Sequence, residues 1–323
     1  MTSSAFDPPS GPARRVLCVG AAVLDTLFRV RSLPIGQGKI LPYDMLQVAE
    51  GMASSAAFAV ARLGGHASLW GAVGDDATGE RIIADLGASG IDTSGMVVAQ
   101  GARSAVSTIL IDDQGERLIV PFYDSRLHDR VMPVTTRDVS SFNAVLVDVR
   151  WPKLALATLS AAREAGKPAI LDGDVAGDGV IEMLAPAASH IVFSQPAAER
   201  LAGTSDLPEI VGRLKRKYEH AFISVTSGEN GSFWFDDPTS KIRHLSAPEV
   251  KAVDTLAAGD IFHGAFALAI AEGMPIEETM RLSSMAAALK CQVFGGRTGA
   301  PSRTEVCDAL RDWNATPLSL LPA

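Results

Sequence analysis

The sequence has few cysteines, few aromatic residues and no long apolar run. Its three cysteines, Cys18, Cys291 and Cys307, lie far apart and form no Cys-x-x-Cys pair. This spacing argues against a disulfide framework and against a zinc site. Aromatic residues make up 6% of the chain and apolar residues 47%. A mixture rich in Ala, Val, Leu and Gly favours a layered α/β protein over an all-β sandwich.

Other absences exclude whole classes of partner. No apolar stretch approaches the roughly 20 residues that span a bilayer, and residues 1–13 lack the apolar centre of a signal peptide. The formal net charge is −8, and the basic footprint of a nucleic-acid-binding protein is missing. We therefore expect a soluble, cytoplasmic protein with a disordered tail at residues 1–13 and with neither a nucleic-acid nor a membrane partner.

The apolar pattern alternates between strand-like and helix-like segments. Residues 15–20 form an apolar run that ends in Gly20, which is typical of a central parallel strand. Further strands are expected at 68–73, 144–149, 168–172, 190–193, 221–226 and 231–235. Helices are expected at 53–63, 79–89, 154–165, 197–202, 207–218, 258–272, 276–290 and 303–312. This alternation predicts one Rossmann-like α/β domain.

Two segments break the alternation. Residues 25–48 carry short apolar pieces interrupted by prolines and glycines, which predicts loops and edge strands. Residues 106–111 and 117–122 are rich in β-formers and flank Asp-Asp-Gln-Gly, which predicts a hairpin. Together they predict a small β lid, formed by about 26–50 and 103–123, within a domain at 14–315 that a C-terminal tail at 316–323 follows. Exposed edges of such a lid favour a homodimer.

The segment that most strongly indicates a catalytic site is Asp254-Thr-Leu-Ala-Ala-Gly-Asp260, which leads into an apolar helix. The N–H groups at a helix N-terminus have no intrahelical partner and bind anions. Asp260 adds a carboxylate beside them. Phosphoryl transfer needs both features, donors for the phosphate and an acceptor for the hydroxyl proton. The same residues also suit an ordinary helix start, because acidic side chains favour that end.

This segment resembles the DTxGAGD motif of the ribokinase-like (PfkB) carbohydrate kinases. Further matches follow the family's order: Val19-Gly-Ala-Ala-Val-Leu-Asp25, Ala61-Arg-Leu-Gly-Gly65, Gly71-Ala-Val-Gly-Asp-Asp76 and Thr226-Ser-Gly-Glu-Asn-Gly231. The resemblance covers nearly the whole chain. It implies a ribokinase-like three-layer Rossmann-type sheet with a small inserted β lid, and an ATP-dependent sugar kinase.

The resemblance implies roles for the matching residues. Those implied in catalysis are Asp260, as the base, and the anion-hole residues Ala257, Ala258 and Gly259. Those implied to hold ATP are Thr226, Gly228 and Gly231 at the phosphates, with Ala287 and Ala288 near the adenine. Those implied to contact the sugar are Asp25 and Gly51.

Some positions depart from the family pattern. Ala257 replaces the first Gly of GAGD, and the diglycine near the sugar reads Ala49-Glu50-Gly51. The NxxE motif, which orders magnesium-bound water in many members, aligns with Ser194 and Ala197.

ATP and Mg²⁺ remain the cofactors that the resemblance implies. Asp172 and Asp174 are the nearest substitute carboxylates for the metal, and a solvated turn is the other interpretation of that pair. The need for a monovalent cation such as K⁺ stays open.

A narrower resemblance concerns the substrate. Six segments look like the sulfofructose kinases, which phosphorylate 6-deoxy-6-sulfofructose on its 1-hydroxyl; they lie at 145–151, 171–174, 193–196, 261–265, 288–291 and 295–299. This resemblance implies that Lys39 and Arg150 bind the sulfonate. A further polar residue that contacts the sulfonate in those kinases, an Asn, is replaced by Pro121 here. An ion pair with an acid such as Asp174 is the other interpretation of Arg150. His263 is interpreted as a packing residue.

Two other functions remain open. A kinase for a neutral ketose, another sugar or a nucleoside would leave Lys39 and Arg150 without an anionic partner. A nucleotide-sensing protein with decayed catalysis is suggested by Ala257 and the lost NxxE, but Asp260 argues against it. An NAD-dependent enzyme is disfavoured because Gly20-Ala-Ala-Val-Leu lacks GxGxxG.

Overall fold

The structure, a computed structural model, describes residues 6, 11–36, 38–129, 133–313 and 319–321. Most of the expected N-terminal tail, 1–13, therefore lies outside the described residues. Within these ranges no helix combines the length and the apolar character needed to cross a bilayer.

A nine-stranded sheet forms the centre of the molecule, in the order β15-β14-β13-β12-β11-β10-β9-β1-β4. The six strands from β12 to β4 are parallel to one another, and β13, β14 and β15 continue the sheet antiparallel. The parallel strands are β1 (Arg15–Val19), β4 (His66–Trp70), β9 (Ala144–Val147), β10 (Ala169–Gly173), β11 (His190–Ser194) and β12 (Phe222–Thr226); the others are β13 (Ser232–Asp236), β14 (Lys241–Leu245) and β15 (Ser319–Leu321).

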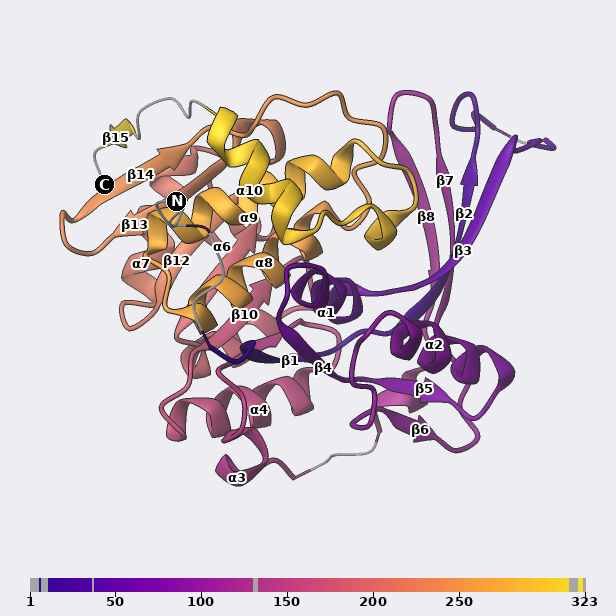
Figure 1. The fold of residues 1–323 in the computed structure, drawn as a ribbon, viewed down its shortest axis with the longest axis horizontal. Helices are drawn as coiled ribbons and strands as arrows, with labels where there is room; N and C mark the ends of the chain where they lie inside the picture. Colours follow the sequence, from indigo (N-terminus) through magenta and orange to yellow (C-terminus); the bar gives the residue numbers. More distant parts are fainter. Residues whose placement is uncertain (1–5, 7–10, 37, 130–132, 314–318, 322–323) are drawn as a thin grey trace.

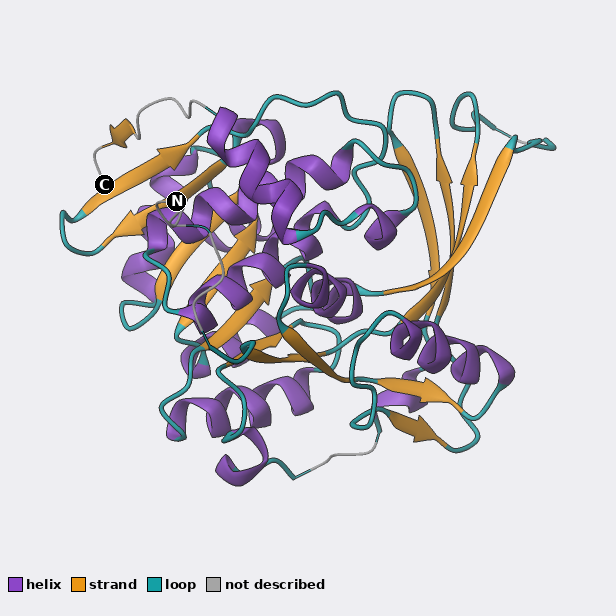
Figure 2. Ribbon diagram, in the orientation of Figure 1, coloured by secondary structure: helices purple, strands orange, loops and turns teal. Residues whose placement is uncertain are grey.

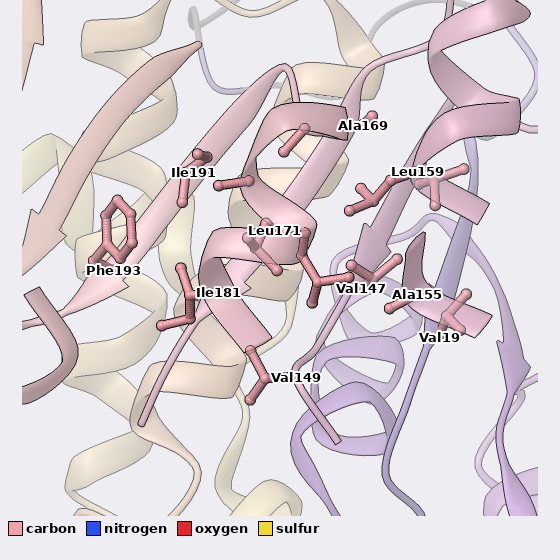
Figure 3. Close-up of a cluster of buried hydrophobic side chains, with 14 of the residues drawn as sticks. Val19, Val147, Val149, Ala155, Leu159, Ala169, Leu171, Ile181, Ile191 and Phe193 are labelled. Atoms are coloured by element: carbon pink, nitrogen blue, oxygen red, sulfur yellow. The ribbon is translucent and has the colours of Figure 1, made fainter. Parts of the chain in front are cut away.

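Helices cover both faces of this sheet, which explains why its parallel strands are almost continuously apolar. One face packs against α1 (Met52–Arg62), α8 (Ala258–Glu272), α9 (Ile276–Cys291) and α10 (Arg303–Asp312). The other packs against α4 (Pro152–Glu164), α5 (Val180–Leu184), α6 (Gln195–Ala202) and α7 (Leu207–Lys217), and Figure 3 shows the interlocking side chains of this second layer. The predicted three-layer α/β fold is confirmed.

A separate four-stranded sheet, in the order β3-β2-β7-β8, extends to one side of the main body (Figures 1 and 2). It consists of β2 (Val23–Arg29), β3 (Asp44–Glu50), β7 (Val106–Ile111) and β8 (Arg117–Phe122). These strands occupy the predicted lid segments. Residues 25–48, for which loops and edge strands were predicted, include most of β2 and most of β3; β3 is an edge strand, whereas β2 lies inside the lid sheet. The alternation was weak there because only a small cluster, including Leu27 and Val48, is buried beneath the lid.

The remaining elements are short or peripheral. Helix α2 (Ala77–Ala88) packs against β3 and against β5 (Ala72–Gly74), which pairs with β6 (Val97–Ala99). The others are α3 (Thr136–Val139) and four 3₁₀ turns, η1 (Ser125–His128), η2 (Ala185–Ala187), η3 (Gly228–Asn230) and η4 (Gly296–Gly299). Ser319–Leu321, inside the expected C-terminal tail, pairs with β14.

Candidate active site

The carboxyl ends of β1, β9, β10, β11 and β12 meet at one edge of the main sheet, where ligands of open α/β sheets bind. Asp148 follows β9, and Asp172 and Asp174 lie at the end of β10. Asp260 enters the same region from the first turn of α8. The fold thus gathers carboxylates that are far apart in the sequence.

The N-terminus of α8 presents backbone N–H groups without intrahelical partners. Ile261 N donates to Ala257 O at 2.9 Å, so the amides of Gly259 and Asp260 precede the first such bond of the helix and have no intrahelical partner. A Cβ atom on Gly259 would have no atom within 4 Å, which leaves room for a ligand against this backbone. The amide of Ala258 differs, because it makes a 3.3 Å bond to Thr255 O. Of the three predicted anion-hole residues, Gly259 therefore offers the most accessible backbone.

Ala257, the N-cap of α8, has a φ of 61° and a ψ of 6°. This left-handed conformation is natural for Gly and costs other residues roughly 1–2 kcal/mol. The Ala at this position therefore keeps the backbone that the family motif assigns to Gly, at the expense of local strain.

Asp260 lies among other charged groups. Burial raises its pKa well above the usual carboxyl range, and the charge of Asp172 raises it further while His263 opposes the shift. Asp172 is almost completely buried, and its own pKa is raised by burial and then by Asp174. A carboxyl with a raised pKa is a stronger base once ionised, which suits a proton acceptor.

His263 is buried, but it does more than pack. Its Nδ1 lies 2.7 Å from Gly259 O, and its Nε2 lies 3.2 Å from Val192 O and 3.4 Å from Asp172 Oδ1. The ring thereby joins the first turn of α8 to β10 and β11. The interpretation as a packing residue was incomplete, because a helical pattern cannot show what lies opposite a ring nitrogen.

Asp25, the predicted sugar-binding residue, lies in β2. Its carboxylate accepts a 2.6 Å hydrogen bond from Ser107 Oγ of β7, and burial raises its pKa to about 6. Gly51, the N-cap of α1, has a φ of 114°, and a Cβ there would lie 2.6 Å from Ala21 O. Gly51 is therefore required by backbone packing, whatever it binds.

Glu50 points into the protein. It is almost fully buried, and it accepts hydrogen bonds from Ser55 Oγ at 2.5 Å and from Arg297 N at 2.7 Å. Burial, and next the charge of Asp25, raise its pKa to about 8. Glu50 is therefore mostly uncharged at neutral pH.

Asp148 is an organising residue that the sequence pattern did not reveal. Its carboxylate accepts hydrogen bonds from the amides of Ala21 (2.8 Å), Ala53 (3.1 Å) and Arg150 (2.8 Å). Gly20 has no room for a side chain, because a Cβ would lie 2.1 Å from this carboxyl group. Asp148 thus caps α1 and fixes the β1–β2 connection.

Arg150 lies at the same edge with 37% of its side chain exposed. One terminal nitrogen lies 3.7 Å from Asp174 Oδ2, and the other donates to Val175 O at 3.3 Å. Tyr123, which follows lid strand β8, lies near the same charges. Partial burial raises the pKa of its phenol, Arg150 lowers it, and Asp148, Asp25 and Asp260 raise it.

The two predicted sulfonate ligands come from different parts of the fold, Lys39 from the lid and Arg150 from the segment after β9. Lys39 lies in the exposed β2–β3 connection of the lid, and no ion pair of Lys39 occurs among those of the described residues. The Asp174 contact shows that the ion-pair interpretation of Arg150 has a structural basis.

The two glycines of the predicted ATP loop differ in their surroundings. Gly228 has a φ of 50° and open space where a Cβ would be. Gly231 has a φ of 84°, and a Cβ there would lie 2.0 Å from Leu245 O. Gly228 thus leaves backbone open to a ligand, whereas Gly231 is required by packing. Thr226, at the end of β12, donates to Phe193 O at 3.3 Å.

Comparisons with known proteins place this chain in a family. The chain matches the model of the pfkB family carbohydrate kinases over residues 13–303. It belongs to the pfkB family. An ATP-dependent ribose-1-phosphate kinase of Halopiger xanaduensis is 30% identical over 291 residues, which cover 89% of this chain and 94% of the relative. The chain is therefore an ATP-dependent carbohydrate kinase.

Solved structures agree in fold. A putative ribokinase from Agrobacterium tumefaciens is 62% identical and superposes with a TM-score of 0.92, covering 93% of this chain and 98% of that one. Ribokinase of Arabidopsis thaliana, complexed with ribose and ATP, is 25% identical with a TM-score of 0.78, covering 93% and 99%. The resemblance to sulfofructose kinases in particular stays a prediction.

The predicted metal residues of this kinase differ in accessibility. Asp172 is buried against His263, whereas Asp174 keeps 35% of its side chain exposed and accepts a 2.7 Å hydrogen bond from Ser194 Oγ. The described residues hold no cluster of three or more His, Cys, Asp or Glu side chains suited to a metal ion. Kinases bind Mg²⁺ through one or two carboxylates together with substrate phosphates, and Asp174 fits that limited role better than Asp172.

The predicted adenine residues lie on α9, which packs against α8. Ala288 is buried and Ala287 is half-buried, so only Ala287 has surface to offer. Their role stays a prediction.

Proposed function

We propose that this kinase transfers the γ-phosphoryl group of ATP to the primary hydroxyl of an anionic ketose, namely the 1-hydroxyl of 6-deoxy-6-sulfofructose. The observation that carries this proposal is Arg150, a half-exposed guanidinium at the carboxyl edge of the sheet beside the carboxylates of the site. One terminal nitrogen of Arg150 lies 3.7 Å from the Asp174 carboxylate, which is too long for a strong hydrogen bond, so the guanidinium of Arg150 can still bind an anion.

In the proposed reaction, Asp260 accepts the proton of the sugar hydroxyl as the hydroxyl oxygen bonds to the γ-phosphorus and the bond to the β-phosphate oxygen breaks. The free amides at the start of α8 stabilise the charge on the transferring group. Asp25 positions the sugar by accepting hydrogen bonds from its hydroxyls. Gly228 lets the loop after β12 approach the phosphates. Mg²⁺, which Asp174 would help to hold, neutralises phosphate charge when bound.

Two observations support an anionic sugar. Glu50 is turned into the protein and has a pKa of about 8, so it adds little negative charge near Asp25 at neutral pH. The Halopiger relative is named for ribose 1-phosphate, which is itself an anionic sugar. The family fold therefore accommodates a substrate of this charge.

A kinase for a neutral sugar is the second candidate. It is favoured by the 3.7 Å contact between Arg150 and Asp174, since a paired arginine needs no substrate anion. Lys39 is exposed on the lid, and no contact among the described residues holds it near Arg150.

An ADP-release assay separates the two candidates. The panel contains 6-deoxy-6-sulfofructose, fructose 6-phosphate, fructose and ribose. The proposal expects the highest kcat/KM for the sulfonated ketose. A preference for fructose or ribose would instead assign the kinase to a neutral sugar.

We also propose that the kinase is a homodimer joined through its lid. All six residues of the edge strand β8 are exposed, and four of them are large and apolar: Leu118, Ile119, Val120 and Phe122. An exposed apolar edge tends to be covered by another chain.

A further inference from the structure

A buried ammonium lies behind the turn that leads into α8. Lys290, near the end of α9, is wholly buried, and its Nζ donates to Asp254 O at 2.7 Å and lies 3.2 Å from Asp254 Oδ2. Asp254 itself is only 1% exposed. A buried carboxylate left without its cation is strongly destabilised, which makes this pair interdependent.

Asp254, which contacts this ammonium, also accepts hydrogen bonds from two backbone segments, the turn before α8 and the segment after α9. Its Oδ1 accepts a 2.8 Å hydrogen bond from Leu256 N, which bends the chain just before Ala257. Its Oδ2 accepts bonds of 3.0 Å from the amides of Gly295 and Gly296. The carboxylate therefore determines the path of the chain into the anion site.

The main chain next to Lys290 holds the same turn. Cys291 O accepts hydrogen bonds from Val253 N at 2.7 Å and from Asp254 N at 3.1 Å. Beyond Asp254, Ala257 adopts its left-handed conformation, a strained state that persists only when its surroundings enforce it. Side chain and main chain of α9 together supply that enforcement.

We propose that Lys290 is a positioning residue for phosphoryl transfer, a cation carried by the protein that orients Asp254 and through it the amides and carboxylate at the start of α8. This proposal rests on the proposed role of the α8 N-terminus. It also implies that no separate monovalent cation is needed at Asp254, because an ammonium already contacts that carboxylate.

Two substitutions that remove the charge but differ in the space they leave test the proposal. Lys290→Ala removes both the charge and the stem and leaves a cavity, whereas Lys290→Met removes the charge but fills most of the space. Displacing a catalytic group by about 1 Å can cost about 100-fold in rate. We expect kcat to fall about 10- to 100-fold in both variants, with the KM for ATP changed less than about threefold.

Added propylammonium chloride, whose three carbons match the three methylenes that Lys290→Ala lacks, is the probe for rescue. It should raise kcat of Lys290→Ala at least about fivefold, because the molecule restores the stem and the charge together. Lys290→Met should not respond, since its side chain occupies the space. Tetramethylammonium chloride at the same ionic strength controls for salt. Rescue that is absent from Lys290→Ala, or equal in both variants, would overturn the proposal.

Arg303→Ala is the matched control. Arg303 is also buried in an ion pair, with Glu272 Oε2 at 2.9 Å, but it joins α10 to the far end of α8. This variant should lose stability while its kcat stays within about twofold of the parent. An equal loss of kcat in both alanine variants would show that Lys290 acts only through stability.

Two variants, Lys290→Met and Asp260→Asn, separate the remaining explanations. If Lys290→Ala does not fold, Lys290→Met decides alone, and a folded Lys290→Met with parental kcat refutes the proposal. Asp260→Asn serves as the reference for the site. If Asp260→Asn stays active, the proposed site itself is wrong. If Asp260→Asn is inactive and Lys290→Ala is fully active, only the role of Lys290 is wrong.

Discussion

At the start of α8, an alanine adopts a backbone conformation that glycine adopts more easily. Ala257 has a φ of 61° in the motif position where the family has Gly. The sequence alone showed the departure from the family but not the conformation. The structure shows that the turn is retained, so the departure itself gives no reason to infer decayed catalysis.

Ala257→Gly should accordingly be neutral or stabilising. The relief of left-handed strain is offset by the greater entropy of glycine in the unfolded chain, which leaves a net gain of about 0–1 kcal/mol. The free energy of unfolding in urea measures this directly, and turnover should stay within about threefold of the parent. Destabilisation by more than about 1 kcal/mol would mean that the Ala257 methyl makes a necessary contact.

Arg150→Ala tests the substrate assignment. Hydrogen bonds to charged groups contribute about 1.5–3 kcal/mol, so KM for the sulfonated ketose should rise about ten- to a hundredfold while turnover of fructose stays low and nearly unchanged. Arg150→Lys should recover only part of this loss, because the planar fork is gone. Steady-state kinetics with both sugars provide the measurement. Equal losses toward both would identify Arg150 as the structural partner of Asp174.

The raised pKa of Asp25 leads to a prediction of how sugar binding depends on pH. Burial raises its pKa to about 6, so in the free enzyme the carboxylate is ionised above that pH and protonated below it. In the proposed site an ionised Asp25 accepts hydrogen bonds from sugar hydroxyls, so kcat/KM for the sugar should fall as the pH drops through about 6. Asp25→Asn should lower kcat/KM and remove this limb of the profile. An unchanged limb in Asp25→Asn would assign it to another group.

At the scale of elements, most of the fold could be predicted because buried parallel strands are short apolar runs, helices have an apolar face, and Gly- or Pro-containing turns separate the elements. The helices at 258–272 and 303–312 and the lid strands at 106–111 and 117–122 have the predicted bounds. Strand β14 was missed, since Lys-Ile-Arg-His-Leu buries only Ile242 and Leu245.

The parts of the site that sequence could not predict depend on contacts between distant segments. Asp148 was hidden because its partners, Ala21 and Ala53, are 127 and 95 residues away. The sequence analysis assigned Lys290 no role, because only the fold brings it to Asp254, 36 residues away. A motif identifies residues that resemble a family, whereas these residues act through a tertiary arrangement.

The lid provides a test of the proposed dimer. Val120 is 62% exposed at the centre of edge strand β8. Val120→Asp should convert the protein into a monomer, because a charge in an apolar contact loses its hydration without gaining a partner. Val98→Asp, at a similarly exposed valine of β6, should leave the assembly unchanged. Light scattering coupled to size-exclusion chromatography measures both masses. A monomeric parent would refute the dimer outright.

For the whole molecule, the main sheet determines which residues meet. The strands that end at one edge bring together Asp148, Asp172 and Asp174, the lid adds Asp25, and α8 adds Asp260. A site so rich in carboxylates suits a reaction in which cations and amide donors manage phosphate charge. The family match supports this chemistry for the fold, and the role of Asp260 is the claim on which the mechanism depends.

The most direct measurement of that claim is the turnover of Asp260→Asn, compared with its affinity for ATP. Asparagine keeps the shape of the side chain and one acceptor oxygen, but it has an NH₂ donor in place of the second oxygen and cannot accept the hydroxyl proton. We predict that kcat falls by about 10²- to 10⁴-fold, the usual range for a positioned proton acceptor, while the Kd for ATP changes less than about threefold. Turnover within a few fold of the parent would contradict the account and remove Asp260 from the mechanism.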